Sequence, residues 1–116
     1  MDDCIFCKIA RSEIPSKKIY EDGEILAFHD IRPQSPVHFM VIPKKHIASL
    51  SDATGEDAGV LGRMLAISGR LAQEQGSPDG YRTIINTGRI GRQEVMHLHM
   101  HVLGGPTPLG RMLPRD

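Results

Sequence analysis

Histidines alternate with apolar residues over residues 96–102, and this stretch constrains the fold more than any other in the chain. A two-residue period is typical of a β-strand with one buried face and one polar face. We therefore expect a strand over 96–102 from which His97, His99 and His101 point in the same direction. Gly104-Gly105 follows and is expected to end the strand and to let backbone approach a ligand.

Such a row of imidazoles admits three interpretations. On a regular strand His97 and His101 lie about 13 Å apart, so one small ion cannot be shared by all three histidines. The row can be a solvated polar face, a zinc site that uses neighbouring histidines, or a site for chemistry on phosphorus, which needs a nucleophile and cationic donors in line. The spacing fits a row of histidines that takes part in a reaction better than it fits a single metal site.

Length and composition exclude several classes of protein. At 116 residues and 12.8 kDa the chain forms one domain with a modest core, which self-association would help to bury. Acidic and basic residues balance at 14 each, and no aromatic residues interleave the two Lys-Lys pairs, so we expect no nucleic-acid partner. Without a long apolar run or a basic N-terminus, we expect no membrane partner and a cytoplasmic location.

The two cysteines, Cys4 and Cys7, lie three positions apart in a short apolar segment that we expect to be helical and to end by Pro15. Their number argues against a disulfide framework. A Cys-x-x-Cys pair can be a zinc half-site or a redox pair. No strand precedes it, which disfavours the redox interpretation. Two small buried hydrophobes remain the alternative.

Strands and one long helix account for most of the remaining chain. The expected strands are 18–20, 25–28, 37–42 and 81–86, the first two joined as a hairpin by a turn at 21–23. Alternation places His38 on one face with Met40 and Ile42. Thr54 begins a capping sequence for a helix that continues to about Gln75.

The expected helix carries a broad apolar face made of two neighbouring stripes. The residues of these stripes are Ala58, Leu61, Leu65 and Ala72, and Val60, Met64, Ile67 and Leu71. Such a face packs in the core or contacts another subunit. The tail 106–114 is apolar without a regular pattern, so we expect it to dock on something, a second subunit being one option.

Two loops have both a functional and an ordinary interpretation. After the hairpin, Phe28 and Ile31 can hold a nucleoside base while Asp30 accepts ribose hydroxyls, but local sequence favours Asp30 as a turn cap before Pro33. The loop 87–94 offers glycines and arginines that can bind a phosphate. It can equally be a flexible hairpin loop.

The segment His97-Leu98-His99-Met100-His101-Val102-Leu103-Gly104-Gly105 resembles the signature of the histidine triad (HIT) superfamily. The resemblance extends over nearly the whole chain, to the histidine triad nucleotide-binding protein branch. The segments that carry it are Ile5-Phe6-x-Lys8-Ile9, Glu13-Ile14-Pro15, Ala27-Phe28-His29-Asp30-Ile31, Pro36-x-His38-Phe39 and Val41-Ile42-Pro43-Lys44-Lys45-His46-Ile47. The ending Pro108-Leu109-Gly110-Arg111-Met112-Leu113 is similar to bacterial members.

The resemblance implies an α+β fold with an antiparallel sheet of about five strands, one long helix and a short N-terminal helix. It implies one domain over 1–116, with an N-terminal segment at 1–15 and a tail at 106–116, and a homodimer. The implied activity is hydrolysis of purine nucleoside 5′-phosphoramidates to a nucleoside monophosphate and an amine. A histidine at position 101, where related nucleotidyltransferases carry glutamine, favours water as the acceptor.

The resemblance also implies roles for individual residues. His99 would attack the α-phosphorus and form a nucleotidyl-histidine, while His101 and His38 would donate to the non-bridging oxygens. Asn86 and the backbone of Gln93–Val95 match phosphate contacts, and Glu94 matches the position that serves the leaving group. The residues that match the base pocket are Ile5, Phe6, Phe28, His29 and Ile31, with Asp30 on the ribose.

Some relatives that resemble this chain hold zinc through a Cys-x-x-Cys pair and two histidines. Residue by residue these ligands are Cys4, Cys7, His46 and His97. Two thiolates and two imidazoles form a closed tetrahedral site, which is structural rather than catalytic. No organic cofactor is implied.

Two positions depart from the family pattern. Arg92 stands where the family usually has glycine, and it is strained by roughly 1 kcal/mol if the position needs a positive φ; otherwise it adds a cation near the phosphates. Met96 replaces an aromatic residue. Three rival functions remain: hydrolysis of dinucleoside polyphosphates, a nucleotide-binding module with incidental turnover, and plain metal binding.

Overall fold

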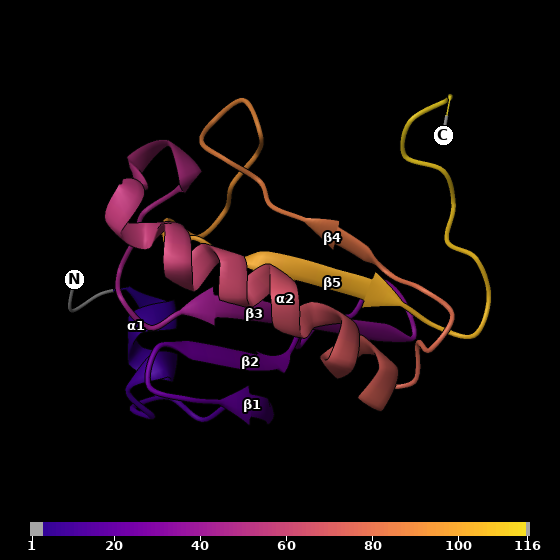
Figure 1. Ribbon diagram of the computed structural model, residues 1–116, viewed down its shortest axis with the longest axis horizontal. Coiled ribbons are helices and arrows are strands. Elements are labelled where there is room, and N and C mark those ends of the chain that lie inside the picture. The colour runs from indigo at the N-terminus through magenta and orange to yellow at the C-terminus, as the bar shows by residue number, and fades with distance from the viewer. Residues whose placement is uncertain (1–3, 116) are drawn as a thin grey trace.

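The computed structural model describes residues 4–115. It contains a five-stranded antiparallel sheet with helices on both faces. The elements in chain order are α1 (Ile5–Ala10), β1 (Lys18–Glu21), β2 (Ile25–His29), β3 (Val37–Pro43), η1 (Leu50–Asp52), η2 (Gly55–Asp57), α2 (Ala58–Glu74), β4 (Arg82–Ile84) and β5 (Met100–Gly104). The strand order is β1-β2-β3-β5-β4 (Figure 1). The predicted α+β class, with its short and long helix, is confirmed.

The two faces of the sheet are covered by different helices. β3, the central strand, is buried along its whole length, and its residues alternate between two apolar clusters. Phe39 and Val41 belong to the cluster beneath α2, whereas Met40 and Ile42 belong to the cluster that includes α1 residues such as Phe6. The predicted alternation on this strand is therefore confirmed.

The long helix α2 packs across β3 and β5 (Figure 1). Met64, Leu71 and Ala72 are almost completely buried against the sheet, and burying a large apolar side chain stabilises the fold by about 1.5–3 kcal/mol. Thr54 forms a capping box with Asp57 at the turn that leads into the helix, as predicted. Leu65 is 54% exposed, although Ala72 of the same predicted stripe is buried and Leu61 packs against the core, so this chain leaves only part of that stripe uncovered.

The histidine row is not one continuous strand, and this part of the prediction is wrong. β5 begins only at Met100, where it pairs with Val41. Before Met100 the chain lies outside the ladder. Leu98 N–H donates to the Ile47 carbonyl, and the Pro43 carbonyl accepts from the His97 ring. β4 is also shorter than predicted, covering Arg82–Ile84 of the expected 81–86.

Among the described residues, no helix is both long enough and apolar enough to cross a bilayer.

The end of β5 passes too close to Ser77 for any side chain at Gly104. A Cβ built at Gly104 would lie 2.1 Å from Ser77 Oγ, which itself donates to the Gly80 carbonyl at 2.6 Å and accepts from Gly105 N–H at 2.9 Å. We predict that Gly104→Ala lowers the free energy of unfolding by about 1–3 kcal/mol, as overpacking does. Urea denaturation checks this.

Gly23→Ala is the matched control, because nothing lies within 4 Å of a Cβ at that turn position. It is expected to leave the midpoint of unfolding nearly unchanged. Equal midpoints for the two variants would contradict the proposed clash at Gly104.

Candidate active site and metal centre

The three predicted catalytic histidines lie together on the face of the sheet opposite α2. His38 comes from the start of β3, His101 from β5 and His99 from the segment before β5. The ring centroid of His101 is 5.1 Å from that of His99 and 5.1 Å from that of His38. His38 and His99 are each only 6% exposed. Buried imidazoles need hydrogen-bond partners, and these partners define the tautomers.

A backbone amide fixes the tautomer of His38. Gln34 N–H donates to His38 Nδ1 at 3.0 Å, so the ring proton of neutral His38 is on Nε2. That nitrogen lies 2.9 Å from Nδ1 of His101, to which it can donate. His101 then carries its own proton on Nε2. The chain of hydrogen bonds leaves one imidazole N–H on His101 for a ligand.

His99 is held in the opposite tautomer. Its Nδ1 lies 2.8 Å from the backbone carbonyl of His97, which can only accept, so Nδ1 carries the proton. The lone pair of His99 is therefore on Nε2. An unprotonated ring nitrogen beside an N–H donor on His101 is the arrangement required for nucleophilic attack on a phosphoryl group.

Burial favours the neutral forms of His38 and His101. It lowers the pKa of His101, with further lowering from His99 and His38, while Asp30 and Glu94 oppose the shift. Burial also lowers the pKa of His38 against the opposing effect of Asp30. Neutral His38 and His101 rings each have a lone pair at physiological pH, which the hydrogen-bond chain between them needs.

Phe6, a residue of the predicted base pocket, lies beside His99. The Phe6 ring lies edge-on to Phe28, at 5.7 Å between centroids, and to His99, at 5.1 Å. Ile31, three positions after Phe28, is 92% exposed, and Ile5, which precedes Phe6, is 46% exposed. His29 ends β2.

Asp30 satisfies the turn interpretation and also faces the histidines. Its Oδ1 accepts from Arg32 N–H at 2.7 Å, as a turn cap does. Its Oδ2 lies 3.4 Å from Nε2 of His38.

The predicted phosphate-binding segment is braced by the side chain of Gln93. Its Oε1 accepts from Gly88 N–H at 2.9 Å, and its Nε2 donates to the carbonyls of Ala48 at 2.7 Å and Val95 at 2.9 Å. The side-chain amide is thus occupied within the chain. Any phosphate contact of Gln93 therefore falls to its backbone.

Arg92 adopts the left-handed conformation, with φ of 61°. Of the two predicted outcomes for Arg92, backbone strain of roughly 1 kcal/mol is therefore the one that the structure supports. Asn86 follows β4 and is half-buried, while Glu94 is exposed. Burial lowers the pKa of His101, and the Glu94 carboxylate opposes this lowering.

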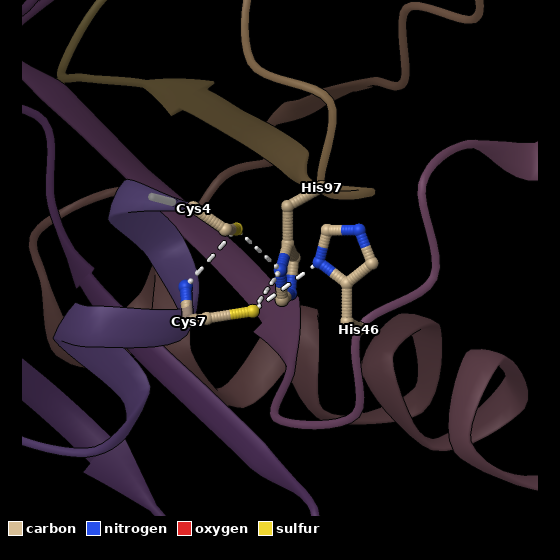
Figure 2. A group of neighbouring side chains, drawn as sticks. All are labelled: Cys4, Cys7, His46 and His97. Atoms are coloured by element: carbon tan, nitrogen blue, oxygen red, sulfur yellow. Dashed lines mark hydrogen bonds between the residues drawn. The ribbon is translucent and has the colours of Figure 1, made fainter. Parts of the chain in front are cut away.

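The four predicted metal ligands meet at one point (Figure 2). Their donor atoms all lie within 4.8 Å of one another, and the residues are Cys4, Cys7, His46 and His97. Both sulfurs face Nδ1 of His97, at 3.4 and 3.5 Å, and the Cys7 sulfur lies 3.2 Å from Nδ1 of His46. Three separate parts of the chain are brought together: α1, the segment after β3 and the segment before β5.

The donor set fits a zinc ion. His97 Nε2 donates to the Pro43 carbonyl at 2.7 Å, so its Nδ1 lone pair faces the sulfurs. A backbone carbonyl that accepts from the other ring nitrogen is a common partner of a zinc-binding histidine. Burial, with Cys4 adding, raises the pKa of the Cys7 thiol to about 11. A cation at this point would supply the charge that stabilises a buried thiolate.

A second cluster, formed by Asp30, His38 and His101, has the spacing of a metal site but fits one poorly. Coordination through His38 Nε2 would require the ring proton to move to Nδ1. That nitrogen already accepts from Gln34 N–H. The cluster is better explained as a hydrogen-bonded chain than as a cation site.

A cavity of about 320 Å³ lies away from the histidines, beside β4 and the C-terminal tail. It is lined by residues 79–82 and 104–109. None of the predicted site residues lines it.

The main-chain hydrogen-bond partners of the histidines could not be predicted from the sequence. The Gln34 amide, the Pro43 carbonyl and the His97 carbonyl set the ring tautomers, and main-chain groups carry no sequence signal. Phe6 was expected only in the base pocket. It also lies 6.0 Å from His97, and so contacts both the cysteine–histidine group and the nucleophile.

The lowered pKa values make stability depend on pH. The pKa values of His38, His97 and His101 are lower in the folded chain, so the unfolded chain binds more protons near pH 6.5 and below. This stability is therefore present above the ordinary histidine pKa and lost as the pH falls through it. We predict that the melting temperature of the chelator-treated protein falls between about pH 7.5 and 5.5.

His38→Asn tests the assignment, since Asn Oδ1 can still accept from Gln34 N–H. The variant should show a shallower dependence of melting temperature on pH over the same range. A slope equal to that of the parent would contradict the role of His38.

Known proteins share both the sequence and the architecture. The HIT domain family matches residues 11–107. The purine nucleoside phosphoramidase of Escherichia coli strain K12 is 48% identical over 113 residues, which cover 97% of this chain and 94% of the relative. A histidine triad protein from Clostridium difficile has a TM-score of 0.89 at 43% identity, covering 96% of this chain and 97% of the other.

A zinc-bound histidine triad family protein from Mycobacterium smegmatis has a TM-score of 0.79 at 34% identity, covering 90% of this chain and 76% of the other. The family match spans most of the chain and includes the histidine row. The chain therefore belongs to the HIT domain family, as the signature at residues 97–105 predicts.

Proposed function

We propose that this protein hydrolyses purine nucleoside 5′-phosphoramidates, breaking the P–N bond through a nucleotidyl-histidine on His99. The observation that carries the proposal is the hydrogen bond from His99 Nδ1 to the His97 carbonyl, which leaves Nε2 unprotonated. The E. coli relative, itself named a purine nucleoside phosphoramidase, supports the substrate class.

In the first step His99 Nε2 attacks the α-phosphorus and the amine departs. The N–H on His101 Nε2 stabilises the charge that develops on a non-bridging oxygen. His38 lies behind His101 in the hydrogen-bond chain. We therefore assign His38 to positioning His101 rather than to direct phosphate contact.

The departing nitrogen needs a proton, and Glu94 is the group proposed to relay it. Water then attacks the phosphorus of the nucleotidyl-histidine and releases the nucleoside monophosphate. Asn86 and the backbone of Gln93–Val95 are proposed to bind the phosphate. Asp30 is proposed to accept the ribose hydroxyls.

The base is proposed to bind beside Phe6 and Phe28, between the exposed side chains of Ile5 and Ile31, with His29 at the edge. An exposed isoleucine next to a buried aromatic pair provides apolar surface for a purine. The aromatic edges and faces add to this contact.

We further propose that Cys4, Cys7, His46 and His97 hold a zinc ion. Zinc supplies a fixed cross-link between distant parts of a chain and needs no redox chemistry. The donor set and the zinc-bound relative support this assignment. Thiolate ligands require reducing conditions, which supports a cytoplasmic location.

The proposed nucleophile is tested by substituting His99. Release of adenosine monophosphate from adenosine 5′-phosphoramidate is expected for the parent and should fall by several orders of magnitude in His99→Ala. Imidazole should partly restore turnover to His99→Gly, which separates loss of the nucleophile from loss of the fold. Parental turnover in His99→Ala would contradict covalent catalysis by this residue.

Two other functions are separated by the same assay. Faster hydrolysis of a dinucleoside polyphosphate than of the phosphoramidate would favour the related hydrolase branch. Tight binding of the monophosphate with negligible turnover by the parent would favour a nucleotide-binding regulatory module.

We also propose a homodimer that covers the exposed surface of α2 around Leu65. Leu65 is 54% exposed on this helix, and a second subunit would bury it. Leu65→Lys is expected to shift the molar mass in light scattering from dimer to monomer. Glu74→Gln changes the net charge equally and lies about 180° around the helix axis, so it should remain dimeric. A monomeric parent, or a dimeric Leu65→Lys, would contradict this interface.

A further inference from the structure

The residue proposed as nucleophile lies outside the sheet ladder. The register of β3 and β5 begins with the pair Val41 and Met100, one residue after His99. Strand pairing therefore does not fix the backbone of His99. Other contacts must hold a group that reacts only from a narrow range of positions.

Three hydrogen bonds hold the segment around His99. Leu98 N–H donates to the Ile47 carbonyl at 2.7 Å. The His97 ring donates to the Pro43 carbonyl at 2.7 Å. The His97 carbonyl accepts from His99 Nδ1 at 2.8 Å. The orientation of the His99 ring thus depends directly on the position of the His97 peptide.

His97 also belongs to the cysteine–histidine cluster, which is made of Cys4, Cys7, His46 and His97. The other ring nitrogen of His97 faces this cluster. Its sulfurs lie 3.4 and 3.5 Å from His97 Nδ1, and Figure 2 shows all four side chains pointing toward one another. His46 immediately precedes Ile47, the residue that accepts from Leu98. Both backbone and side chain of the 97–98 segment are therefore tied to the cluster.

Phe6 provides a second connection. It lies on α1 between the two cysteines, and its ring contacts His97 at 6.0 Å and His99 at 5.1 Å between centroids. A change in the position of α1 would therefore reach His99 through packing as well as through the peptide of His97.

We infer that the cysteine–histidine cluster, when it holds its metal ion, positions the nucleophile, in addition to stabilising the fold. Its members are positioning residues: they set the His97 peptide, and that peptide sets the ring tautomer and direction of His99. This inference rests on the proposed function of His99 as nucleophile. A purely structural cluster would stabilise the chain without affecting the rate of the chemical step.

The test compares Cys7→Ser with the zinc-loaded parent and with Ile9→Ala. Ile9 lies on the same helix and is 7% exposed in the same apolar cluster as Phe6, but it provides no ligand. Ile9→Ala should lower the melting temperature while leaving zinc content and kcat near parental values. It therefore reports what destabilisation of α1 does by itself.

Cys7→Ser is expected to lose zinc and to lower kcat by roughly 10- to 100-fold, because misplacing a reactive group by about 1 Å has effects of this size. The effect on kcat should exceed that on KM, because the inference concerns the reacting group, whereas a shift of the base-pocket residues on α1 would act mainly on KM. Chelation of the parent should reproduce the loss, and added zinc chloride should reverse it, which covers the case in which Cys7→Ser folds poorly. An unchanged kcat after zinc loss would overturn the inference, as would a parent that binds no zinc.

A spectroscopic measurement separates this inference from the proposed function. The ¹⁵N shifts of the His99 ring, assigned with His99→Asn, should indicate a single Nδ1–H tautomer in the zinc-loaded parent. They should move toward the average of two tautomers when zinc is removed. If the parent does not hydrolyse phosphoramidates, the proposed function fails, but this shift still shows that the cluster sets the tautomer of the His99 ring. Identical shifts with and without zinc would overturn the inference whatever the activity.

Discussion

A sheet buried on both faces is the constraint on which the site depends. One face of β3 and β5 packs against α2 with apolar residues alone, such as Phe39, Val41 and Val102. The other face is covered in part by α1 and carries the histidines. Burial lowers the pKa values of His38, His97 and His101 there, and buried ring nitrogens take defined hydrogen-bond roles. The chemistry proposed for the site follows from these roles.

Main-chain groups set these roles. A backbone N–H fixes the tautomer of His38, whereas backbone carbonyls fix the tautomers of His97 and His99. His38 accepts from a backbone N–H and so presents its Nε2 proton to His101. His97 and His99 both donate to backbone carbonyls, so the lone pair of each is on the remaining nitrogen. The lone pair of His97 faces two sulfurs and that of His99 is left for a substrate. Neighbouring histidines on one face can therefore serve a metal and a nucleophilic reaction.

The sequence predicted the order and type of the elements because their apolar patterns are strong. Alternation identified β3 and the face of His38, and the capping residues located the start of α2. The start of β5 was misplaced because the segment before Met100 is held by hydrogen bonds outside the ladder, from Leu98 N–H to Ile47 and from the His97 ring to Pro43. A side-chain pattern carries no information about such a choice.

The candidate site could be predicted as a set of residues but not as a network. The spacing of the cysteines and histidines, with the family resemblance, was enough to name the residues of the metal cluster, which the structure brings together. The link from that cluster to His99 depends on one peptide carbonyl and one aromatic ring. Neither is visible without the three-dimensional arrangement.

The loop before the histidine row shows how a departure from the family pattern is accommodated. Arg92 is left-handed, which costs roughly 1 kcal/mol relative to glycine. Gln93, the next residue, makes three side-chain hydrogen bonds to backbone groups on both sides of the loop and on the segment after β3. Each such bond contributes about 0.5–1.5 kcal/mol, so together they outweigh the strain. Hydrogen bonds of the neighbouring Gln93 thus offset the strain of a non-glycine residue at position 92.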